Sequence, residues 1–156
     1  MAKTIKVLNQ LGGQQVSNTF PITVPVFAGA ISSIKTGMLV ITDGAHAGYW
    51  KAAADAATTT ELINGGIATS ESTETVGDNG TVTIETAPVM LVSVKAKTPA
   101  NLTAAMRGVA FILDVDGSGN YTLDQATSVN GIFNILDYDN TTDGNCTCAL
   151  TTHWRG

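Results

Sequence analysis

Apolar and polar residues alternate along several short stretches of this chain. In residues 81–85 (TVTIE), valine and isoleucine fall on one side of an extended chain and threonine and glutamate on the other, which predicts a half-buried β-strand. Residues 89–94, 109–113 and 132–138 carry apolar residues on both sides, so they predict strands near the centre of the fold. Residues 146–150 alternate again and predict a final strand with one apolar face.

Turn-forming residues separate these stretches. Residues 38–42 form a short apolar run that ends at Asp43-Gly44, a dipeptide that favours a tight hairpin turn. Helical signals are weak: residues 51–62 are rich in alanine and predict one or two helical turns, and residues 98–103 predict a single turn. The sequence therefore predicts a mainly β protein, a small antiparallel β-barrel or sandwich with at most one or two short helices.

The 156 residues fit one domain with an extension. Residues 1–19 lack strand or helix periodicity and predict an extended N-terminal arm, whereas residues 20–156 predict a single β-rich domain. Within this domain, residues 69–79 (TSESTETVGDN) are polar and acidic with almost nothing to bury. We therefore expect a mobile surface loop at that position.

The stretch FPITVPVF combines strand-like alternation with two prolines. Ile22, Val24 and Val26 fall on one side of an extended chain. Pro21 and Pro25 lack the N–H group that a strand in the middle of a sheet must donate. Two interpretations stay open: an edge strand of the protein's own sheet, or an extended segment that pairs with a neighbouring subunit.

Composition and charge restrict the range of partners. Apolar residues make up 44% of the chain and charged residues only 13%, which suggests that part of the surface faces a partner rather than water. The net charge is −5 and the lysines and arginines are scattered, so the basic stripe that binds nucleic acid is missing. The chain also has no signal-peptide-like run and no apolar run of about 18 residues. We expect a soluble protein made in the cytosol, without a membrane span.

The motif with the sharpest chemical implication is DVDGSGN. It matches the first positions of a calcium-binding loop, with oxygen ligands at Asp114, Asp116 and Ser118. The backbone at Asn120 would supply a further oxygen. The last position of such a loop needs a bidentate glutamate, but Gln125 stands there, and the preceding RGVAFIL predicts a strand rather than a helix. We predict a hairpin turn without a metal, and a calcium-binding β-module is the alternative.

Candidates for catalysis are few. Cys146 and Cys148 are separated by one residue on a predicted strand, so both thiols face the same side, a disulfide between them would be strained, and we predict two free, buried thiols. A nucleophile–base pair between a thiol and His153 is disfavoured, because the seven residues from Cys146 to His153 span more than about 20 Å of extended chain. The sequence contains no serine elbow, phosphate loop or zinc helix. It predicts no enzymatic activity, no catalytic residue and no cofactor.

Residues 106–150 resemble the C-terminal half of the head decoration (cement) proteins of tailed bacteriophages. The resemblance is carried by RGV at residues 107–109, an Asp-Gly turn at residues 116–120, DQATS at residues 124–128 and IF at residues 132–133. It implies a small β-barrel-like protein that binds the outside of an expanded capsid and clamps adjacent capsid subunits, often as a trimer. It also implies an N-terminal arm that reaches a neighbouring subunit by strand addition.

Together these observations predict a viral capsid decoration protein that lies on the outer surface of the virion and stabilises the phage head. Its expected partners are the major capsid protein and further copies of itself in a trimer. Another structural subunit of a phage shell, tail or fibre is an alternative. We expect the capsid or subunit interface to contain Phe20, Pro21, Ile22, Val24, Pro25, Val26, Phe27 and, in the aromatic C-terminal tail, Trp154.

Overall fold

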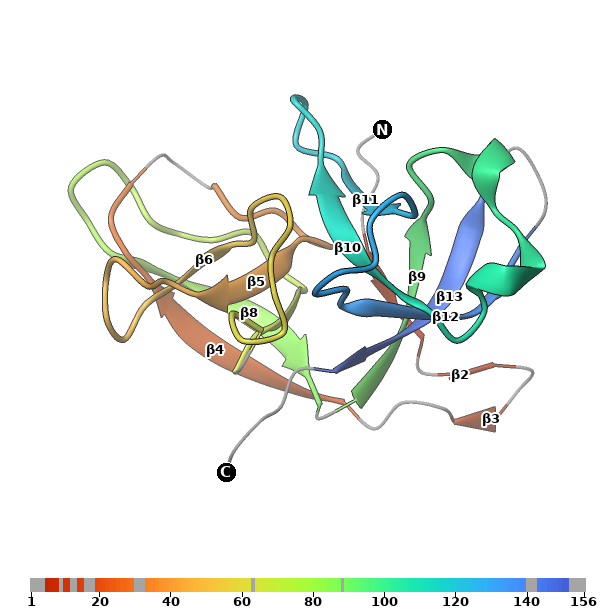
Figure 1. Cartoon of the computed structure of the whole chain (residues 1–156). Coiled ribbons are helices and arrows are strands. Elements are labelled where there is room, and N and C mark those ends of the chain that lie inside the picture. Colours follow the sequence, from red (N-terminus) through yellow and green to blue (C-terminus); the bar gives the residue numbers. More distant parts are fainter. Residues whose placement is uncertain are drawn as a thin grey trace.

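The computed structural model describes residues 5–8, 10–11, 14–15, 19–29, 33–62, 64–87, 89–139 and 143–151. Most of the secondary structure within these residues is β (Figure 1), and the mainly β class predicted from the sequence is confirmed. The strands are β1 (Lys6–Val7), β2 (Gln10–Leu11), β3 (Gln14–Gln15), β4 (Phe20–Val26), β5 (Leu39–Thr42), β6 (Trp50–Ala52), β7 (Gly66–Ala68), β8 (Gly80–Thr86), β9 (Val89–Lys95), β10 (Ala110–Val115), β11 (Tyr121–Asp124), β12 (Phe133–Tyr138) and β13 (Asn145–Thr151).

Five of these strands form a closed barrel in the order β4-β6-β5-β7-β8. β4 and β8 are antiparallel and pair over seven positions, from Phe20 opposite Thr86 to Val26 opposite Gly80. On its other side β4 meets β6 through one parallel bridge, between Val26 and Trp50. The barrel is therefore closed at one end of β4 only. Its interior is filled by the buried side chains of Val24, Val26, Ile34, Val40, Ala68, Val82 and Ile84.

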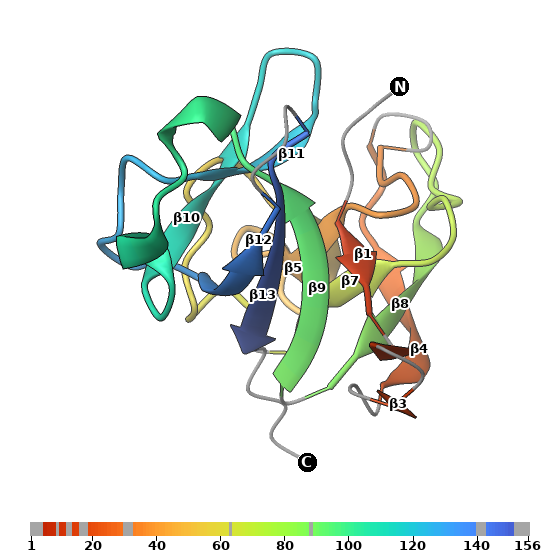
Figure 2. The same cartoon turned by 90° about the vertical axis from the view of Figure 1, so that its right-hand side faces the viewer.

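A second sheet contains six strands in the order β1-β9-β13-β12-β10-β11. Figure 2 shows β9 and β13 side by side, with β12 and β10 following around the curl of the sheet. The curl brings the far edge back toward β9, because Ala96 forms an isolated parallel bridge with Leu123 of β11. This sheet therefore encloses an apolar interior of its own, which contains Phe111, Phe133 and Ile135.

The barrel and the six-stranded sheet share one large core. Successive residues of β5 point to opposite sides: Val40 fills the barrel, whereas Leu39 and Ile41 lie in the large core with the side chains of the sheet. Ile67 of β7 joins them there. β5 is thus buried on both faces, and the two units pack as parts of a single structure.

The described residues within the predicted arm, residues 1–19, take part in β structure. β1 is the edge strand of the six-stranded sheet and pairs with β9. Ile5, which precedes β1, is buried in the large core, and its N–H donates to the carbonyl oxygen of Gly37 at 3.0 Å. β2 and β3 pair with each other as a short antiparallel ribbon. The described beginning of the chain is therefore part of the β structure.

Helix is limited to two short 3-10 turns within the described residues, Pro99–Asn101 and Ala104–Met106. The first confirms the helical turn predicted within residues 98–103. Within residues 51–62 the structure has no helix and a single closed turn, in which Leu62 N donates to Thr58 O at 3.2 Å. The alanine-rich part is not helical, because Ala53 and Ala57 are buried in the large core and Ala56 adopts a positive φ of 56°. Packing against the sheet outweighs the helix propensity of alanine there.

Candidate functional site

The outer side of β4 is the first candidate for a binding surface. Phe20 and Phe27 are 46% and 39% exposed, and Pro21 and Pro25 are exposed between them. Of the other predicted interface residues, Val24 and Val26 are buried inside the barrel and Ile22 packs against them, so these three face the protein's own core rather than a partner. Trp154 lies outside the described residues.

The backbone of β4 presents acceptors rather than donors along its open edge. In β8, Thr81 and Thr83 direct their backbone groups away from β4: the C=O of Thr81 accepts from Thr73 N at 3.0 Å, and that of Thr83 from Thr69 N at 2.9 Å. In an antiparallel pair, two residues that lie opposite each other either both direct their N–H and C=O groups at each other or both direct them away from the partner strand. Pro25 and Thr23, which lie opposite Thr81 and Thr83, therefore also point away from the ladder.

This geometry decides between the two interpretations of the stretch FPITVPVF. β4 belongs to the chain's own barrel, because it pairs with β8 along its whole length. It is edge-like, because it meets β6 through a single bridge and most of its other side is unpaired by strands of the barrel. Pro21 and Pro25 occupy outward backbone positions and have no N–H to donate, which leaves Thr23 as the outward donor among these three positions. A second chain would find too few donors for a regular added strand. Contacts along this edge must therefore rely on side chains.

An aromatic cluster marks the end of β4, at the end of the barrel that lies away from the six-stranded sheet (Figure 1). The Phe27 ring stacks on the His46 ring, with 3.8 Å between centroids and an interplanar angle of 10°. Tyr49 meets Phe27 edge-on at 5.4 Å. We call Phe27, His46 and Tyr49 the distal cluster. Such stacked and edge-on pairs are favourable geometries for aromatic rings.

Polar side chains fix the distal cluster in place. Asp43 accepts hydrogen bonds from Ala45 N at 3.0 Å and from His46 Nδ1 at 2.7 Å. Burial raises the pKa of Asp43, but the bonds from His46 and Ala45 and the charge of Lys51 outweigh burial and hold that pKa below its ordinary value. The carboxylate therefore stays ionised and holds the loop between β5 and β6 in one conformation.

Asn79 connects that loop to the residues after β4. Its Oδ1 accepts a hydrogen bond from Ala28 N at 2.8 Å, and its Nδ2 donates to the Tyr49 hydroxyl at 2.9 Å. The distal cluster thus combines one exposed and two partly exposed rings with a fixed geometry, which lowers the entropy that a binding partner would have to remove. Sequence reasoning identified Phe27 but not His46, Tyr49 or Asn79. The only signal for them was the Asp43-Gly44 turn, which lies in the loop that carries two of these side chains.

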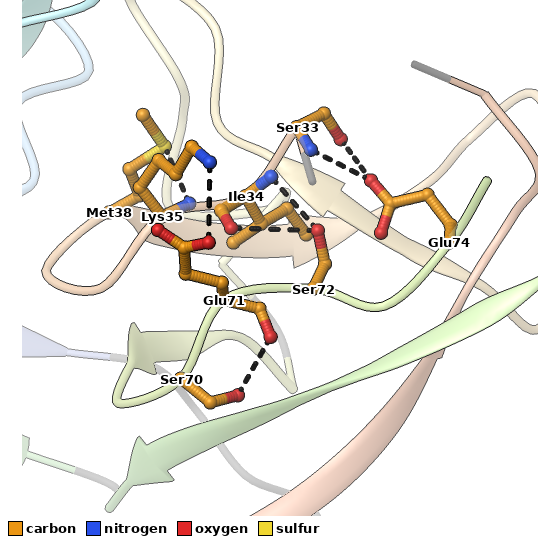
Figure 3. Close-up of polar contacts among 8 residues, drawn as sticks. All are labelled: Ser33, Ile34, Lys35, Met38, Ser70, Glu71, Ser72 and Glu74. Atoms are coloured by element: carbon orange, nitrogen blue, oxygen red, sulfur yellow. Dashed lines mark hydrogen bonds and ion pairs between the residues drawn. The ribbon is translucent and has the colours of Figure 1, made fainter. Parts of the chain in front are cut away.

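The segment 69–79 is joined to the barrel by buried polar contacts (Figure 3). Glu74 is only 1% exposed, and its Oε1 accepts from Ser33 N at 3.0 Å and from Ser33 Oγ at 2.5 Å. Ser72 is also buried, and its Oγ accepts from Ile34 N at 3.0 Å. We call Ser33, Ser72 and Glu74 the polar lock. The expectation that this segment has almost nothing to bury is therefore wrong.

The charge of Glu74 is retained despite its burial. Burial raises the pKa of Glu74, but hydrogen bonds from Ser33 and Ser72 outweigh burial and hold that pKa below its ordinary value. Its second oxygen, Oε2, is buried and has no hydrogen-bond partner among the described residues. The contacts of the polar lock join residues 33–34, before β5, to residues 72–74, before β8. We interpret it as a structural feature that positions the segment beside β8.

The motif DVDGSGN forms the hairpin loop that was predicted, between β10 and β11. Asp116 accepts from Ser118 N at 2.8 Å and from Asn120 N at 3.0 Å, so its carboxylate closes the turn. Asp114 instead accepts from Lys97 Nζ at 2.7 Å and from Thr122 Oγ1 at 3.1 Å. The two carboxylates serve different partners, and no group of three potential metal-ligating side chains occurs in the described part of the chain. The calcium-binding alternative stays a prediction.

The two cysteines are free and buried, as predicted. Both lie on β13 and both contribute to the large core. Burial, with a smaller contribution from Asp139, raises the pKa of Cys146 to about 11, and burial raises the pKa of Cys148 further. Thiolates, which are the nucleophilic form, are therefore scarce at neutral pH. His153 lies outside the described residues.

Comparison with protein families, with curated proteins and with solved structures finds no match for this chain. No helix among the described residues is long and apolar enough to cross a membrane. The fold and the site thus define a mainly β protein with a closed five-stranded barrel, whose exposed β4 edge ends in the distal cluster. The resemblance of residues 106–150 to phage decoration proteins stays a prediction.

Proposed function

We propose that this protein is a capsid decoration protein, which binds the outer surface of a phage head and clamps neighbouring copies of the major capsid protein. The observation that carries the proposal is the exposed outer side of β4 with the fixed distal cluster at its end. In this proposal Phe20, Pro21, Pro25 and Phe27 contact the capsid. Val24 and Val26 act only by holding β4 in the barrel.

The chemistry of this surface supports docking on a protein. Thr23 and Thr83 face each other on the outside of the barrel, with 3.3 Å between their hydroxyl oxygens. Pro25 and Thr81 lie on one side of this pair, and Pro21 and the partly buried Glu85 lie on the other. The centre of the face is thus uncharged, and protein interfaces are depleted of charge at their centre. Aromatic side chains such as Phe27 are favoured anchors in such interfaces.

In this proposal, the binding of many copies to one shell stabilises the head mechanically. A shell offers the same junction many times, so many modest contacts add up to strong resistance against rupture. Self-association of the protein as a trimer on the capsid would raise this avidity further. The low proportion of charged residues, 13%, agrees with a chain that covers part of its surface in an assembly.

The test is co-sedimentation of purified protein with expanded empty capsids of tailed phages. We expect saturable binding at a fixed ratio of protein to capsid subunits, with no comparable binding to unexpanded capsids. Pelleting that stays at background over the whole concentration range would remove the proposal.

Variants locate the contact. Phe27→Ser and Pro25→Lys should weaken binding by about tenfold or more, because each changes an exposed residue of the proposed face. Val129→Lys is the matched control, since Val129 is 73% exposed and follows β11, in the other unit of the molecule. Equal binding of all three variants would show that the capsid contact lies elsewhere.

A further inference from the structure

Three Asn-Gly dipeptides occur in this chain, at Asn64-Gly65, Asn79-Gly80 and Asn130-Gly131. In such a pair the backbone nitrogen of the glycine can attack the side-chain amide carbon of the asparagine. A new C–N bond closes a five-membered succinimide ring, and the amide nitrogen leaves as ammonia. Water then opens the ring to aspartate or isoaspartate. Glycine permits this attack best because it has no Cβ to obstruct it.

The structure protects two of the three sites. The Asn79 amide is fixed at both ends, by Ala28 N on Oδ1 and by the Tyr49 hydroxyl on Nδ2. Asn64 has a buried Oδ1, and its backbone carbonyl accepts from Trp50 Nε1 at 2.9 Å. Neither side chain can turn toward the following nitrogen without breaking contacts or moving buried atoms.

Asn130 differs from both. It is exposed, and its side chain makes no hydrogen bond with any described residue. It lies in a turn beside Val129, which is 73% exposed. The one bond that holds the attacking nitrogen is that from Gly131 N to Ser128 O, at 3.2 Å. Opening one exposed turn costs far less than opening the core.

We infer that Asn130 is the site at which this protein modifies itself by spontaneous deamidation. Gly131 N attacks Cγ of Asn130, ammonia leaves, and one water molecule opens the succinimide. The product carries one additional negative charge on the loop between β11 and β12. Asn64 and Asn79 are the internal references, because they share the Asn-Gly chemistry but their side-chain amides are held by hydrogen bonds (Asn79) or partly buried (Asn64).

The two products should affect the fold differently. Isoaspartate adds one CH₂ to the main chain directly before Gly131. That glycine lies so close to β10 that a Cβ on it would be 2.3 Å from the carbonyl oxygen of Ala110. The next residue, Ile132, donates its N–H to Phe111 O at 2.9 Å, immediately before β12 begins. The isoaspartate form should therefore disturb the pairing of β10 with β12, whereas aspartate adds only a charge.

The test is to keep the intact protein in mildly alkaline buffer at physiological temperature and to map peptides by tandem mass spectrometry over time. We expect a gain of one mass unit at Asn130 at a rate at least tenfold above the rates at Asn64 and Asn79. Urea-unfolded protein should modify all three sites at similar rates, because each attack occurs within the same Asn-Gly dipeptide and no fold restrains it. Faster modification of Asn64 or Asn79 in the folded protein, or an Asn130 that reacts only in urea, would overturn the inference.

A variant distinguishes deamidation at Asn130 from other modifications that make the protein more acidic. Asn130→Ser should abolish the first acidic species in ion-exchange chromatography. Asn101→Ser is the control, because Asn101 is also exposed but precedes leucine instead of glycine. If Asn130→Ser accumulates the same acidic species at the same rate as the parent protein, the modified residue lies elsewhere and the inference fails.

Discussion

The barrel and the six-stranded sheet differ in how much apolar side chain each encloses. Among the residues that the structure describes, the barrel interior holds seven that are buried, all of them valine, isoleucine or alanine. The large core holds aromatic rings, leucines and Met90, and its members come from both units. Because hydrophobic stabilisation grows with buried apolar area, the barrel interior alone contributes the smaller share.

The barrel compensates for its small interior in two ways. Leu39, Ile41 and Ile67 on its strands are buried in the large core, so the barrel is stabilised from outside as well as from inside. The polar lock adds hydrogen bonds between residues about forty positions apart in the chain, such as Ser33 and Glu74. The comparison indicates that the barrel depends on the sheet more than the sheet depends on the barrel.

The largest effect is expected from Ile135→Ala. Ile135 is fully buried on β12 in the large core, so the substitution should lower the free energy of unfolding by about 3–5 kcal/mol. Because both units share this core, urea unfolding followed by circular dichroism should remain a single transition at a lower midpoint. Survival of the barrel as a separate, later transition would contradict its dependence on the sheet.

Ile84→Ala is the matched substitution in the barrel. Ile84 is also fully buried, but it faces the smaller interior, and we expect a loss of about 2–3 kcal/mol. The loss should be local, so amide hydrogen exchange should accelerate in β4 and β8 more than in β9 and β13. Equal acceleration in both units would show that barrel and sheet open together.

Local patterns predicted the strands well because alternation depends on neighbouring residues only. The predicted strands at 81–85 and 89–94 correspond to β8 and β9 within one residue at each end. Pro21 and Pro25 left two interpretations open, an edge strand or a segment that pairs with a neighbour, and the structure places β4 in the chain's own barrel between β8 and β6. The free, buried thiols and the hairpin at DVDGSGN also followed from local chemistry.

Features that depend on contacts between distant residues were not predictable. The composition of residues 69–79 indicated exposure, but Glu74 and Ser72 are buried because they bond to residues 33 and 34. The distal cluster unites Phe27, which directly follows β4, with His46 and Tyr49 from the loop between β5 and β6. Closure of the barrel through Val26 and Trp50 likewise joins two strands whose sequences show no sign of the pairing.

Glu74→Gln tests the polar lock. The substitution removes the charge that accepts from Ser33 and should cost about 1–3 kcal/mol at neutral pH. Glu71→Gln is the control, because Glu71 is exposed and pairs only with Lys35 at 3.4 Å. This control should leave the stability almost unchanged, and a loss as large as that of Glu74→Gln would show that the segment responds to its total charge instead.

Glu74 also predicts that the stability of the fold depends on pH. The pKa of Glu74 is lower in the folded protein than its ordinary value of 4.5, so the unfolded chain binds the proton more readily. Its contribution to stability is therefore complete above pH 4.5 and is lost as the pH falls through the folded pKa. Thermal unfolding measured across this range should show a smaller decrease for Glu74→Gln than for the parent protein. Parallel pH profiles would indicate that other carboxylates cause the decrease.

The smallest effect on stability is expected from Pro25→Thr, which tests the open edge of β4. Pro25 is exposed and its backbone points away from β8, so the substitution should change the free energy of unfolding by less than about 1 kcal/mol. It does, however, give the edge a second outward N–H beside that of Thr23, which makes strand addition by another copy easier. Analytical ultracentrifugation should therefore detect more self-association than in the parent protein.

Thr23→Val is the control for this prediction. It changes an exposed side chain on the same strand without adding a donor to the backbone, so the sedimentation of this variant should match that of the parent. Increased association of Thr23→Val to the same extent would assign the effect to side-chain hydrophobicity. A monomeric Pro25→Thr at all concentrations would show that the prolines do not keep this edge from pairing, and that the short bridge to β6 protects it instead.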